Sequence, residues 1–282
     1  MLAPVSVIVL TYNEEANIVQ CLENVKEWTD DIIIIDSNSK DRTIDIAKSY
    51  TNNIYQIDAG HWAEIRNWAM QNANIKYEWV LFLDADEMIS DELKKEINEK
   101  IAQNPTENGF YFKRRFIFLD KWLKHGGLYP EVLRLYRYKY TRYIKAGDVE
   151  YAVVDGKTGK LKSDMIHKDL KPVSVWIDKH NRISERAREQ YFIEKGGKSS
   201  IIDKMNSASQ IEGGTRKHLI KEKIWDKIPL TLRAFVIFVY TYVFMLGFLD
   251  GIEGFYYHAL QSFWYRLLIA VKVREYVLKT VR

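Results

Sequence analysis

The N-terminal third of the chain alternates short apolar runs with helical patterns. Four runs, at residues 5–10, 32–35, 54–57 and 79–83, have the length and residue types of strands that are buried on both faces. Helical patterns follow them over residues 18–25, 43–50, 61–74 and 91–101. Alternating strands and helices predict an α/β fold with a mostly parallel central sheet that is covered by helices on both faces.

Two of these helices begin with recognisable capping signals. Ser90 is a good N-cap, and Asp91 and Glu92 follow it where the positive end of a helix favours acidic side chains. The helix near residue 43 is expected to have Ser39 or Asp41 as its N-cap. Both helices therefore start directly after a polar loop.

Acidic residues follow the end of each predicted strand. Glu14, Asp36, Asp58 and Asp84 lie in the loops after the first to the fourth strand. The carboxyl ends of parallel strands meet at one edge of a sheet, which is where open α/β sheets bind ligands. The four loops are therefore expected to converge on one crevice.

The fourth strand ends in the sequence DADE, at residues 84–87. Carboxylates at alternate positions, such as Asp84 and Asp86, can share a hard divalent cation whose shell is completed by substrate phosphates. The alternative is that they are solvated loop residues at the start of the next helix. The acidic loops after the other strands favour the ligand-binding interpretation.

Composition sets further bounds. The 282 residues carry 42 basic and 38 acidic side chains, a net charge of +4 that is too balanced to favour nucleic acid as the main partner. Cys21 is the single cysteine, is expected to serve packing, and fits a reducing compartment. The N-terminus lacks the basic region of a secretory signal, so the catalytic part is expected to face the cytosol.

Residues 109–143 are dense in aromatic and basic side chains whose alternation indicates antiparallel strands. Stacking faces combined with cations suit a nucleic acid. Saccharides also stack on aromatic rings, and we favour the saccharide interpretation.

The segments TYNEE (11–15), IIIIDSNSKDRT (32–43), Arg66-Asn67 and WVLFLDADE (79–87) together resemble the family 2 glycosyltransferases. Their order and spacing carry the resemblance. It implies a GT-A fold that binds a nucleotide-activated sugar with a divalent metal, Mn²⁺ or Mg²⁺. We expect the donor to be a UDP-sugar.

Several residues match positions where this family contacts the nucleoside. Thr11, Asn13 and Glu14 match its first nucleotide-binding loop. Asp36 matches the acid that contacts base or ribose, and Asp58 is a weaker candidate beside the base. The resemblance therefore implies that these loops bind the donor.

Other residues match the phosphate and metal positions of the family. Arg66 matches a basic residue near the phosphates. Asp86 matches the usual metal ligand of the D-x-D motif, Asp84 lies closer to the ribose or to the waters of the metal, and Glu87 is expected behind them. His167 either completes the metal shell or touches the diphosphate, with a hydrogen bond inside a loop as the alternative.

The middle of the chain resembles the acceptor half of a subgroup that includes lipopolysaccharide-core and capsule glycosyltransferases. In that subgroup an acid after the arginine-rich strand is the general base, and Glu150 occupies this place. Val149 stands where a histidine is common, so Asp148 is the alternative base. Lys179 and Arg182 are expected either to grip phosphate or to solvate a helix face. One base and one metal imply direct displacement with inversion.

The C-terminal part is apolar and aromatic. Residues 216–227 are basic with interleaved apolar positions, residues 234–249 carry no charge, and residues 254–273 are interrupted by Arg266 and Lys272. Both apolar stretches predict helices at a membrane surface, because the uncharged run is short for a span. The alternatives are a helical hairpin packed on the catalytic domain and oligomerisation through the same surface.

The sequence thus predicts a nucleotide-sugar-binding half at 1–108, an acceptor-binding half at 109–200 and a membrane-associating or oligomerising tail at 201–282. The expected protein transfers a sugar from a nucleotide sugar to a saccharide or lipid-linked saccharide of a bacterial surface glycan, at the cytoplasmic face of the inner membrane. A non-catalytic nucleotide-sugar-binding membrane subunit and a sugar-phosphate nucleotidyltransferase are the alternatives. A phosphatase-like fold is disfavoured because its acids normally follow the first strand.

Overall fold

The computed structural model describes residues 2–58, 60–146, 149–195 and 228–280. They form two compact units. The first comprises Met1–Lys124, Leu128–Lys145 and Val149–Lys171, and the second comprises His125–Gly127, Ala146–Asp148 and Pro172–Arg282. The main segment of the second unit begins at Pro172, and the predicted boundaries at residues 108 and 200 stay predictions.

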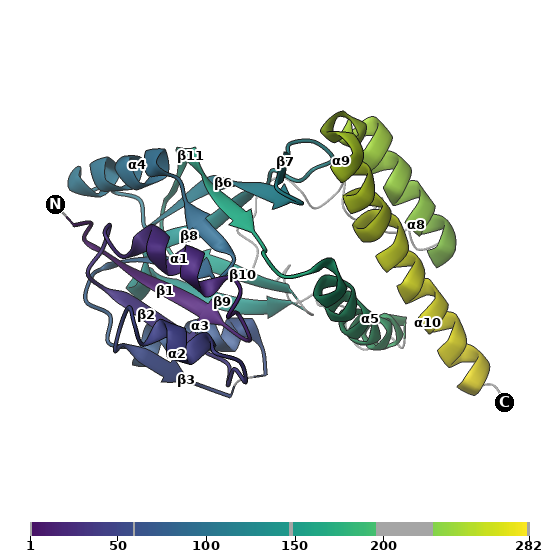
Figure 1. Cartoon of the computed structure of the whole chain (residues 1–282), viewed down its shortest axis with the longest axis horizontal. Coiled ribbons are helices and arrows are strands. Elements are labelled where there is room, and N and C mark those ends of the chain that lie inside the picture. Colours follow the sequence, from purple (N-terminus) through teal and green to yellow (C-terminus); the bar gives the residue numbers. More distant parts are fainter. Residues whose placement is uncertain (1, 59, 147–148, 196–227, 281–282) are drawn as a thin grey trace. The chain divides into compact units, whose positions relative to one another are not determined.

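The first half of the central sheet is parallel. Its strands are β1 (Val5–Thr11), β2 (Ile32–Asp36), β3 (Ile54–Gln56) and β4 (Trp79–Asp84), in the order β3-β2-β1-β4, of which Figure 1 labels the first three. Every neighbouring pair in this set is parallel, as the alternation of strands and helices predicts. The ends of β1, β2 and β4 therefore lie along one edge of the sheet.

The sheet continues as β8-β6-β11-β5, and β7 pairs with β6. These strands are β5 (Glu87–Ile89), β6 (Gly109–Phe118), β7 (Lys121–Leu123), β8 (Glu131–Arg137) and β11 (Thr158–Lys168). Only β6 and β11 pair in parallel here. The pairs β4–β8, β5–β11, β6–β7 and β6–β8 are antiparallel. The complete sheet is mixed instead of mostly parallel. A separate hairpin consists of β9 (Thr141–Ala146) and β10 (Val149–Val154).

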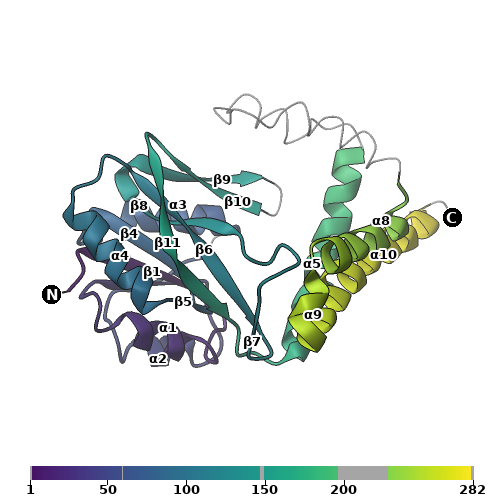
Figure 2. The same ribbon diagram turned by 90° about the horizontal axis from the view of Figure 1, so that it is seen from above.

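Helices cover both faces of the sheet (Figure 2). Residues of α1 (Ile18–Val25), α2 (Thr43–Ala47) and α4 (Asp91–Ala102) share one core cluster. Residues of α3 (Trp62–Asn72) share a second cluster with Tyr136 of β8. The β9–β10 hairpin packs on this second cluster, which places it on the α3 face of the sheet.

The helix caps only partly follow the prediction. The Ser90 hydroxyl accepts the N–H of Leu93 at 3.1 Å, which confirms this residue as the N-cap of α4. Arg42, not Ser39 or Asp41, is the N-cap of α2 and makes no side-chain capping bond. Asp41 still accepts the N–H of Thr43 at 3.0 Å. It therefore satisfies a backbone donor at the start of α2, although it is not the N-cap residue.

The second unit is helical. It contains α5 (Val173–Lys195), α8 (Leu230–Val239), the π-helix η2 (Tyr240–Phe244), the 3-10 turn η3 (Gly247–Asp250), α9 (Gly251–Tyr257), the π-helix η4 (His258–Trp264) and α10 (Tyr265–Thr280). Lys272 of α10 donates to the carbonyl of Asn181 on α5 at 2.8 Å. The predicted basic stretch 216–227 lies outside the described residues.

Within the described residues, no individual helix has both the length and the apolar character of a membrane span. The segments Leu230–Phe244 and Gly247–Thr280 meet those criteria only as a pair, with a bend of 70° between them.

The loop His125–Gly127, between β7 and β8, belongs to the helical unit. Asp250 accepts the backbone N–H of His125 at 2.9 Å and lies 2.8 Å from its Nδ1. Gly126 donates to the carbonyl of Met245 at 2.8 Å. Gly126 has φ +68, and a β-carbon on it would lie 2.2 Å from the buried ring of His258. Only glycine fits here.

We therefore predict that Gly126→Ala destabilises the protein by about 2–4 kcal/mol, because a left-handed residue and an overpacked site each cost free energy. The measurement is the free energy of unfolding from denaturant titration followed by circular dichroism. Gly60→Ala is the control, because nothing lies within 4 Å of a β-carbon at that position. Equal stability of both variants would contradict the packing described for His258.

Candidate active site

Asp36 organises the loops after β1 and β2. Its buried carboxylate accepts from the hydroxyl of Thr11 at 2.7 Å and from the backbone N–H of Ser39 at 2.8 Å, and it also accepts the hydroxyl of Ser39. Gln56 donates to it from β3 at 3.3 Å. Asp36 thus connects the loops after β1 and β2 through its side chain. Its predicted contact with a base or ribose stays a prediction.

The first loop is held in a turned conformation. Asn13 has φ 53, a left-handed conformation that asparagine tolerates well, and its side-chain oxygen accepts the N–H of Lys40 at 2.7 Å. Glu14 accepts from Lys171 at 2.6 Å and from Asn17 at 2.8 Å. The loop is therefore attached both to the segment after β2 and to the segment after β11.

Asp58 follows β3 and is exposed. The N–H of the preceding residue, Ile57, donates to the carbonyl of Asp36 at 2.9 Å. Asp58 therefore lies near the same sheet edge, and its predicted place beside a base stays a prediction.

Two arginines bind the carboxylate of Asp84 at the end of β4. Arg66 donates to one oxygen at 2.8 Å, and Arg134 donates to the other at 2.7 Å. Burial disfavours ionisation of Asp84, but the charges of Arg134 and Arg66 outweigh it and hold its pKa well below the ordinary value. Asp84 is therefore ionised at neutral pH and fixed in orientation.

Glu87 lies behind Asp84 and is completely buried. One of its oxygens accepts from Arg134 and from Arg114, each at 3.2 Å, and the other accepts the backbone N–H of Asp84 at 3.0 Å. This pairing locks the turn that contains Asp86. Sequence reasoning did not identify Arg114 and Arg134 individually; their signal is the basic residues in the alternating strands β6 and β8.

Asp86 and His167 face each other without a hydrogen bond. Oδ1 of Asp86 lies 3.4 Å from Nδ1 of His167, and both atoms are buried and lack a hydrogen-bonding partner. Burial, followed by the charges of Asp84 and Glu87, raises the pKa of Asp86 well above its ordinary value. Burial also lowers the pKa of His167. Burial therefore opposes the charged form of each group.

The ring of His167 stacks on Phe116, with centroids 5.2 Å apart and planes at 17°. The register between β11 and β5 sets His167 opposite Glu87. Two strands therefore carry the imidazole to the D-x-D turn, although His167 lies 81 residues beyond Asp86 in the chain.

This pair fits a divalent metal. Among the described residues no group of three or more Cys, His, Asp or Glu side chains forms a metal site. Asp86 and His167 offer two ligand atoms that have no hydrogen-bonding partner, a carboxylate oxygen and an imidazole nitrogen. These two atoms lie 3.4 Å apart. Cations such as Mg²⁺ are commonly bound by one or two protein ligands together with substrate phosphates. A bound cation would stabilise negative charge on a departing diphosphate.

Arg66 connects Asp84 to Glu150. Its Nε donates to Oε1 of Glu150 at 2.8 Å, and its guanidinium lies 5.3 Å from the ring centroids of both Phe82 and Tyr143. Arg66 is only 2% exposed, so it positions the two carboxylates from beneath. The predicted contact of Arg66 with phosphate stays a prediction.

Glu150 has one fixed and one unpaired oxygen. Arg66 holds Oε1, whereas Oε2 is enclosed and has no hydrogen-bonding partner. The alternative base, Asp148, lies outside the described residues. Of the two candidate bases, only Glu150 therefore lies among the described residues. Its unpaired oxygen is suited to accept a proton.

Lys179 and Arg182 lie on α5 in the second unit and are both exposed. Their contact with phosphate stays a prediction.

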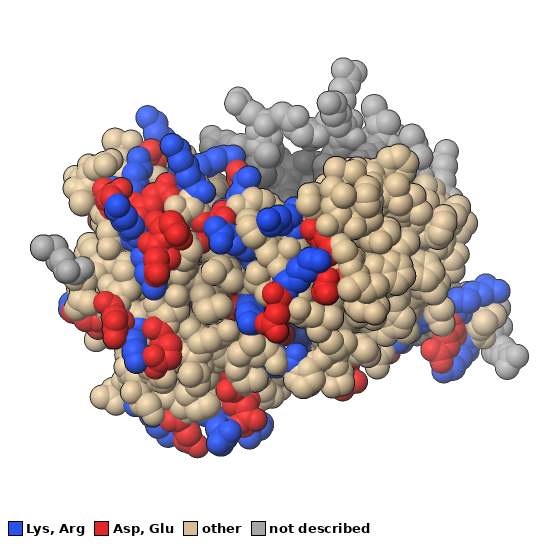
Figure 3. Space-filling model, turned by 45° about the horizontal axis from the view of Figure 1, so that its top comes forward, with Lys and Arg blue, Asp and Glu red and all other residues tan. Residues whose placement is uncertain are grey.

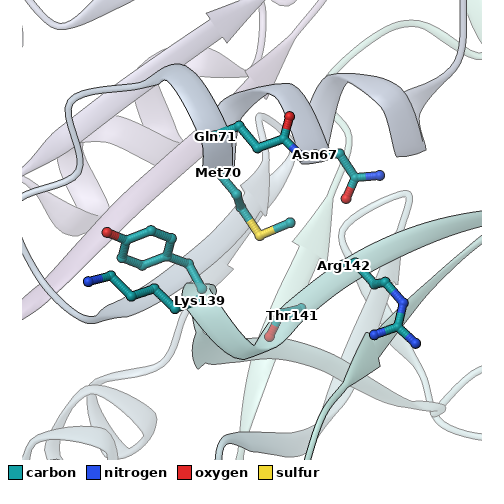
Figure 4. Close-up of a pocket in the computed structure, with 7 residues that line it drawn as sticks. Asn67, Met70, Gln71, Lys139, Thr141 and Arg142 are labelled. Atoms are coloured by element: carbon teal, nitrogen blue, oxygen red, sulfur yellow. The ribbon is translucent and has the colours of Figure 1, made fainter.

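A cavity of about 310 Å³ lies apart from these carboxylates. It is lined by Asn67, Met70, Gln71, Tyr138, Lys139, Thr141 and Arg142. Figure 4 shows Met70 and Gln71 on α3, Lys139 just before β9, and Thr141 and Arg142 on β9. Asp84, Asp86 and Glu150 do not line it, so we do not assign the chemistry to this cavity.

Known proteins have similar sequences and structures. Glycosyl transferase family 2 matches residues 6–157. An uncharacterized glycosyltransferase of Rickettsia typhi is 25% identical over 292 residues, covering 98% of this chain and 88% of that protein. The prophage-derived glycosyltransferase SunS of Bacillus subtilis is 37% identical over 98 residues, covering 34% of this chain and 22% of SunS.

Among solved structures, residues 1–349 of S. aureus TarS are 15% identical with a TM-score of 0.44, covering 98% of this chain and 92% of that one. This likeness is too low to carry an argument about function. The family match spans more than half of the 282 residues and includes the loops, the D-x-D turn and Glu150. The chain therefore belongs to glycosyl transferase family 2 and is a glycosyltransferase.

Proposed function

We propose that this glycosyltransferase moves a sugar from a UDP-sugar to a saccharide or lipid-linked saccharide of a bacterial surface glycan, such as lipopolysaccharide or capsule. The transfer depends on Mn²⁺ or Mg²⁺ and inverts the anomeric carbon. The observation that carries the proposal is the bridge made by Arg66, which holds Asp84 and one oxygen of Glu150 while the other oxygen of Glu150 remains unpaired.

Glu150 is the general base of this reaction. Its Oε2 takes the proton of the acceptor hydroxyl as the hydroxyl oxygen forms a bond to the anomeric carbon. The bond from that carbon to the diphosphate oxygen breaks on the opposite face, and its electron pair leaves with the nucleoside diphosphate. One displacement inverts the configuration, so no carboxylate is needed as a nucleophile.

Donor binding falls to the loops after β1, β2 and β4. Thr11, Asn13 and Glu14 are held in a fixed loop, which reduces the conformational entropy lost when a nucleotide binds. Asp86 and His167 supply the two protein ligands of the metal. The choice of UDP rests on the resemblance to the family.

We predict that Asp86→Asn abolishes the metal-dependent part of UDP binding. The apo variant is expected to melt above the wild type: the pKa of Asp86 is raised by folding, so its ionised carboxylate destabilises the fold at neutral pH. The measurement is the melting temperature with UDP, with and without Mn²⁺.

Asp91→Asn is the control for this experiment, because its side chain is 92% exposed. An unchanged effect of Mn²⁺ in Asp86→Asn would show that the metal is held elsewhere. GDP and dTDP are tested in parallel to identify the nucleotide class. If none of the three nucleotides stabilised the protein, the donor assignment would be contradicted.

Glu150→Gln is expected to retain UDP and metal binding and to lose at least about a hundredfold in transfer rate, because the amide cannot accept the proton. The measurement is release of UDP from a UDP-sugar in the presence of acceptor glycans. Glu99→Gln, on the exposed side of α4, is the control. A Glu150→Gln enzyme with wild-type turnover would move the base to Asp148. A wild-type protein that binds donor but transfers nothing would favour a non-catalytic binding subunit.

The helical unit carries an exposed apolar surface. Its exposed large apolar side chains include Phe235, Tyr240, Phe244, Leu249 and Ile252, between 53% and 73% exposed. Figure 3 shows a broad area of this unit without acidic or basic side chains. Residues 234–249 contain no Asp, Glu, Lys or Arg. An apolar surface of this extent, rich in aromatic residues, fits the interface of a lipid bilayer.

We place the protein at the cytoplasmic face of the inner membrane, bound peripherally or monotopically through this surface. A lipid-linked acceptor then keeps its tail in the bilayer. A second copy of the chain bound to the same surface is the rival occupant.

The test is flotation with phosphatidylcholine and phosphatidylglycerol liposomes. We expect the wild type to float and Phe244→Asp with Leu249→Asp to lose most of the bound fraction, because each carboxylate must be desolvated to enter the interface. Val19→Asp, on an exposed apolar residue of α1, is the control. Equal flotation of the double variant would reject the surface, and a change only in oligomeric state would favour self-association.

A further inference from the structure

A second group of side chains on the first unit combines cations with aromatic rings. Lys113 lies 4.6 Å from the ring centroid of Tyr129, and Arg115 and Lys124 lie 4.7 and 4.5 Å from that of Trp122. The two rings meet edge to face at 5.7 Å. We call these five residues the cation–aromatic cluster. They come from β6, β7 and the segment that leads into β8.

A buried acid fixes the centre of the cluster. Asp164 on β11 is 5% exposed, and its two oxygens accept separately from Nε of Arg115 at 2.8 Å and from the hydroxyl of Tyr129. Burial and this hydrogen bond raise the pKa of Tyr129 to about 12, so the phenol remains protonated. The positions of one cation and one ring are therefore set before any ligand binds.

The cluster keeps positive charge that the described residues do not neutralise. Arg115 is paired with Asp164, but Lys113 and Lys124 have no carboxylate within 4 Å among the residues that the structure describes. The acid opposite Lys113 in the sheet, Glu131, is engaged by Lys160 at 2.6 Å. Two ammonium groups are thus available to an anion.

The indole of Trp122 adds an unused donor. Its Nε1 is enclosed and has no hydrogen-bonding partner in the described structure. A buried donor without a partner costs free energy, which a ligand oxygen would recover. The cluster therefore offers both charge and a hydrogen-bond donor to one ligand.

The cluster lies on the same face of the sheet as Glu150. Phe112 packs in the core cluster beneath α4, so alternation along β6 turns Lys113 and Arg115 to the other face. The β9–β10 hairpin, which carries Glu150, packs on that face through Ala152. The cluster and Glu150 therefore lie on the same side of the sheet, the side to which we assign the acceptor.

We infer that the cation–aromatic cluster binds an anionic group of the acceptor, and that the acceptor is a saccharide bearing phosphate or carboxylate. The inference rests on the proposed role of Glu150 in activating the acceptor. Lysine ammonium groups bind the anion, and the aromatic rings of Tyr129 and Trp122 contact the apolar face of a sugar ring.

The test compares glucose, glucuronate and glucose 6-phosphate, which differ mainly in charge. The full chain is labelled with ¹⁵N in its tryptophan indoles and kept with excess UDP and Mn²⁺, so that the donor site is filled. Of the eight tryptophans, the signal of Trp122 is assigned from Trp122→Phe. We expect this signal to shift with glucose 6-phosphate or glucuronate and not with glucose.

The matched variants are Lys113→Gln with Lys124→Gln, and Lys48→Gln with Lys95→Gln on exposed helix surfaces. The first pair should weaken binding of the charged sugar roughly tenfold or more, and the second pair should leave it unchanged. A response to one charged probe alone identifies the anion. Equal responses to glucose and glucose 6-phosphate, or binding unaffected by the first pair, would overturn the inference.

Failure of this inference is distinguishable from failure of the proposed function. If the wild type did not bind UDP, the proposed donor site would be rejected. The comparison between the two lysine pairs would still show whether the cluster binds the charged sugar. Conversely, normal UDP binding without any difference between the pairs would reject the cluster alone.

Discussion

The arrangement of the site depends on the buried guanidinium of Arg66. A charged group that is only 2% exposed is strongly destabilising unless its charge and its donors are matched. Asp84 and Glu150 match its charge from two distant segments of the chain, through Nη2 and Nε at 2.8 Å each, whereas its Nη1 has no hydrogen-bonding partner among the described residues. The two carboxylates are therefore both held by one planar cation, through its Nε and Nη2, which restricts where each can lie.

Arg134 and Arg114 extend the same principle to Glu87. Together the three arginines balance Asp84, Glu87 and Glu150, and Asp86 is the acid of the turn that receives no arginine. Its raised pKa and its unsatisfied oxygen follow from this distribution of charge. The one acid left without a protein cation is thus the one that the family resemblance marks as the metal ligand.

Local pattern was sufficient to predict the first half of the fold. Strands β1 to β4, the buried faces of α1 and α4 and the Ser90 cap follow from periodicity and capping chemistry, and Cys21 is buried and unpaired as expected. The sheet order beyond β4 was not predictable, because it depends on pairings between distant strands. The same holds for Arg134, whose two acidic partners lie 50 and 47 residues away. The boundary at residue 171 depends on α5 packing with α10, which no local signal reveals.

The two units are not consecutive pieces of chain. The strand segment ending at Lys124 passes through His125–Gly127, which belongs to the helical unit, before it returns at Leu128. A chain that stopped at Lys171 would retain His125 but lack Asp250, and the backbone N–H of His125 would lose its acceptor. The catalytic unit therefore cannot be separated at a single cut without leaving part of the helical unit behind. Evolutionary exchange of the tail among relatives would have to exchange this loop with it.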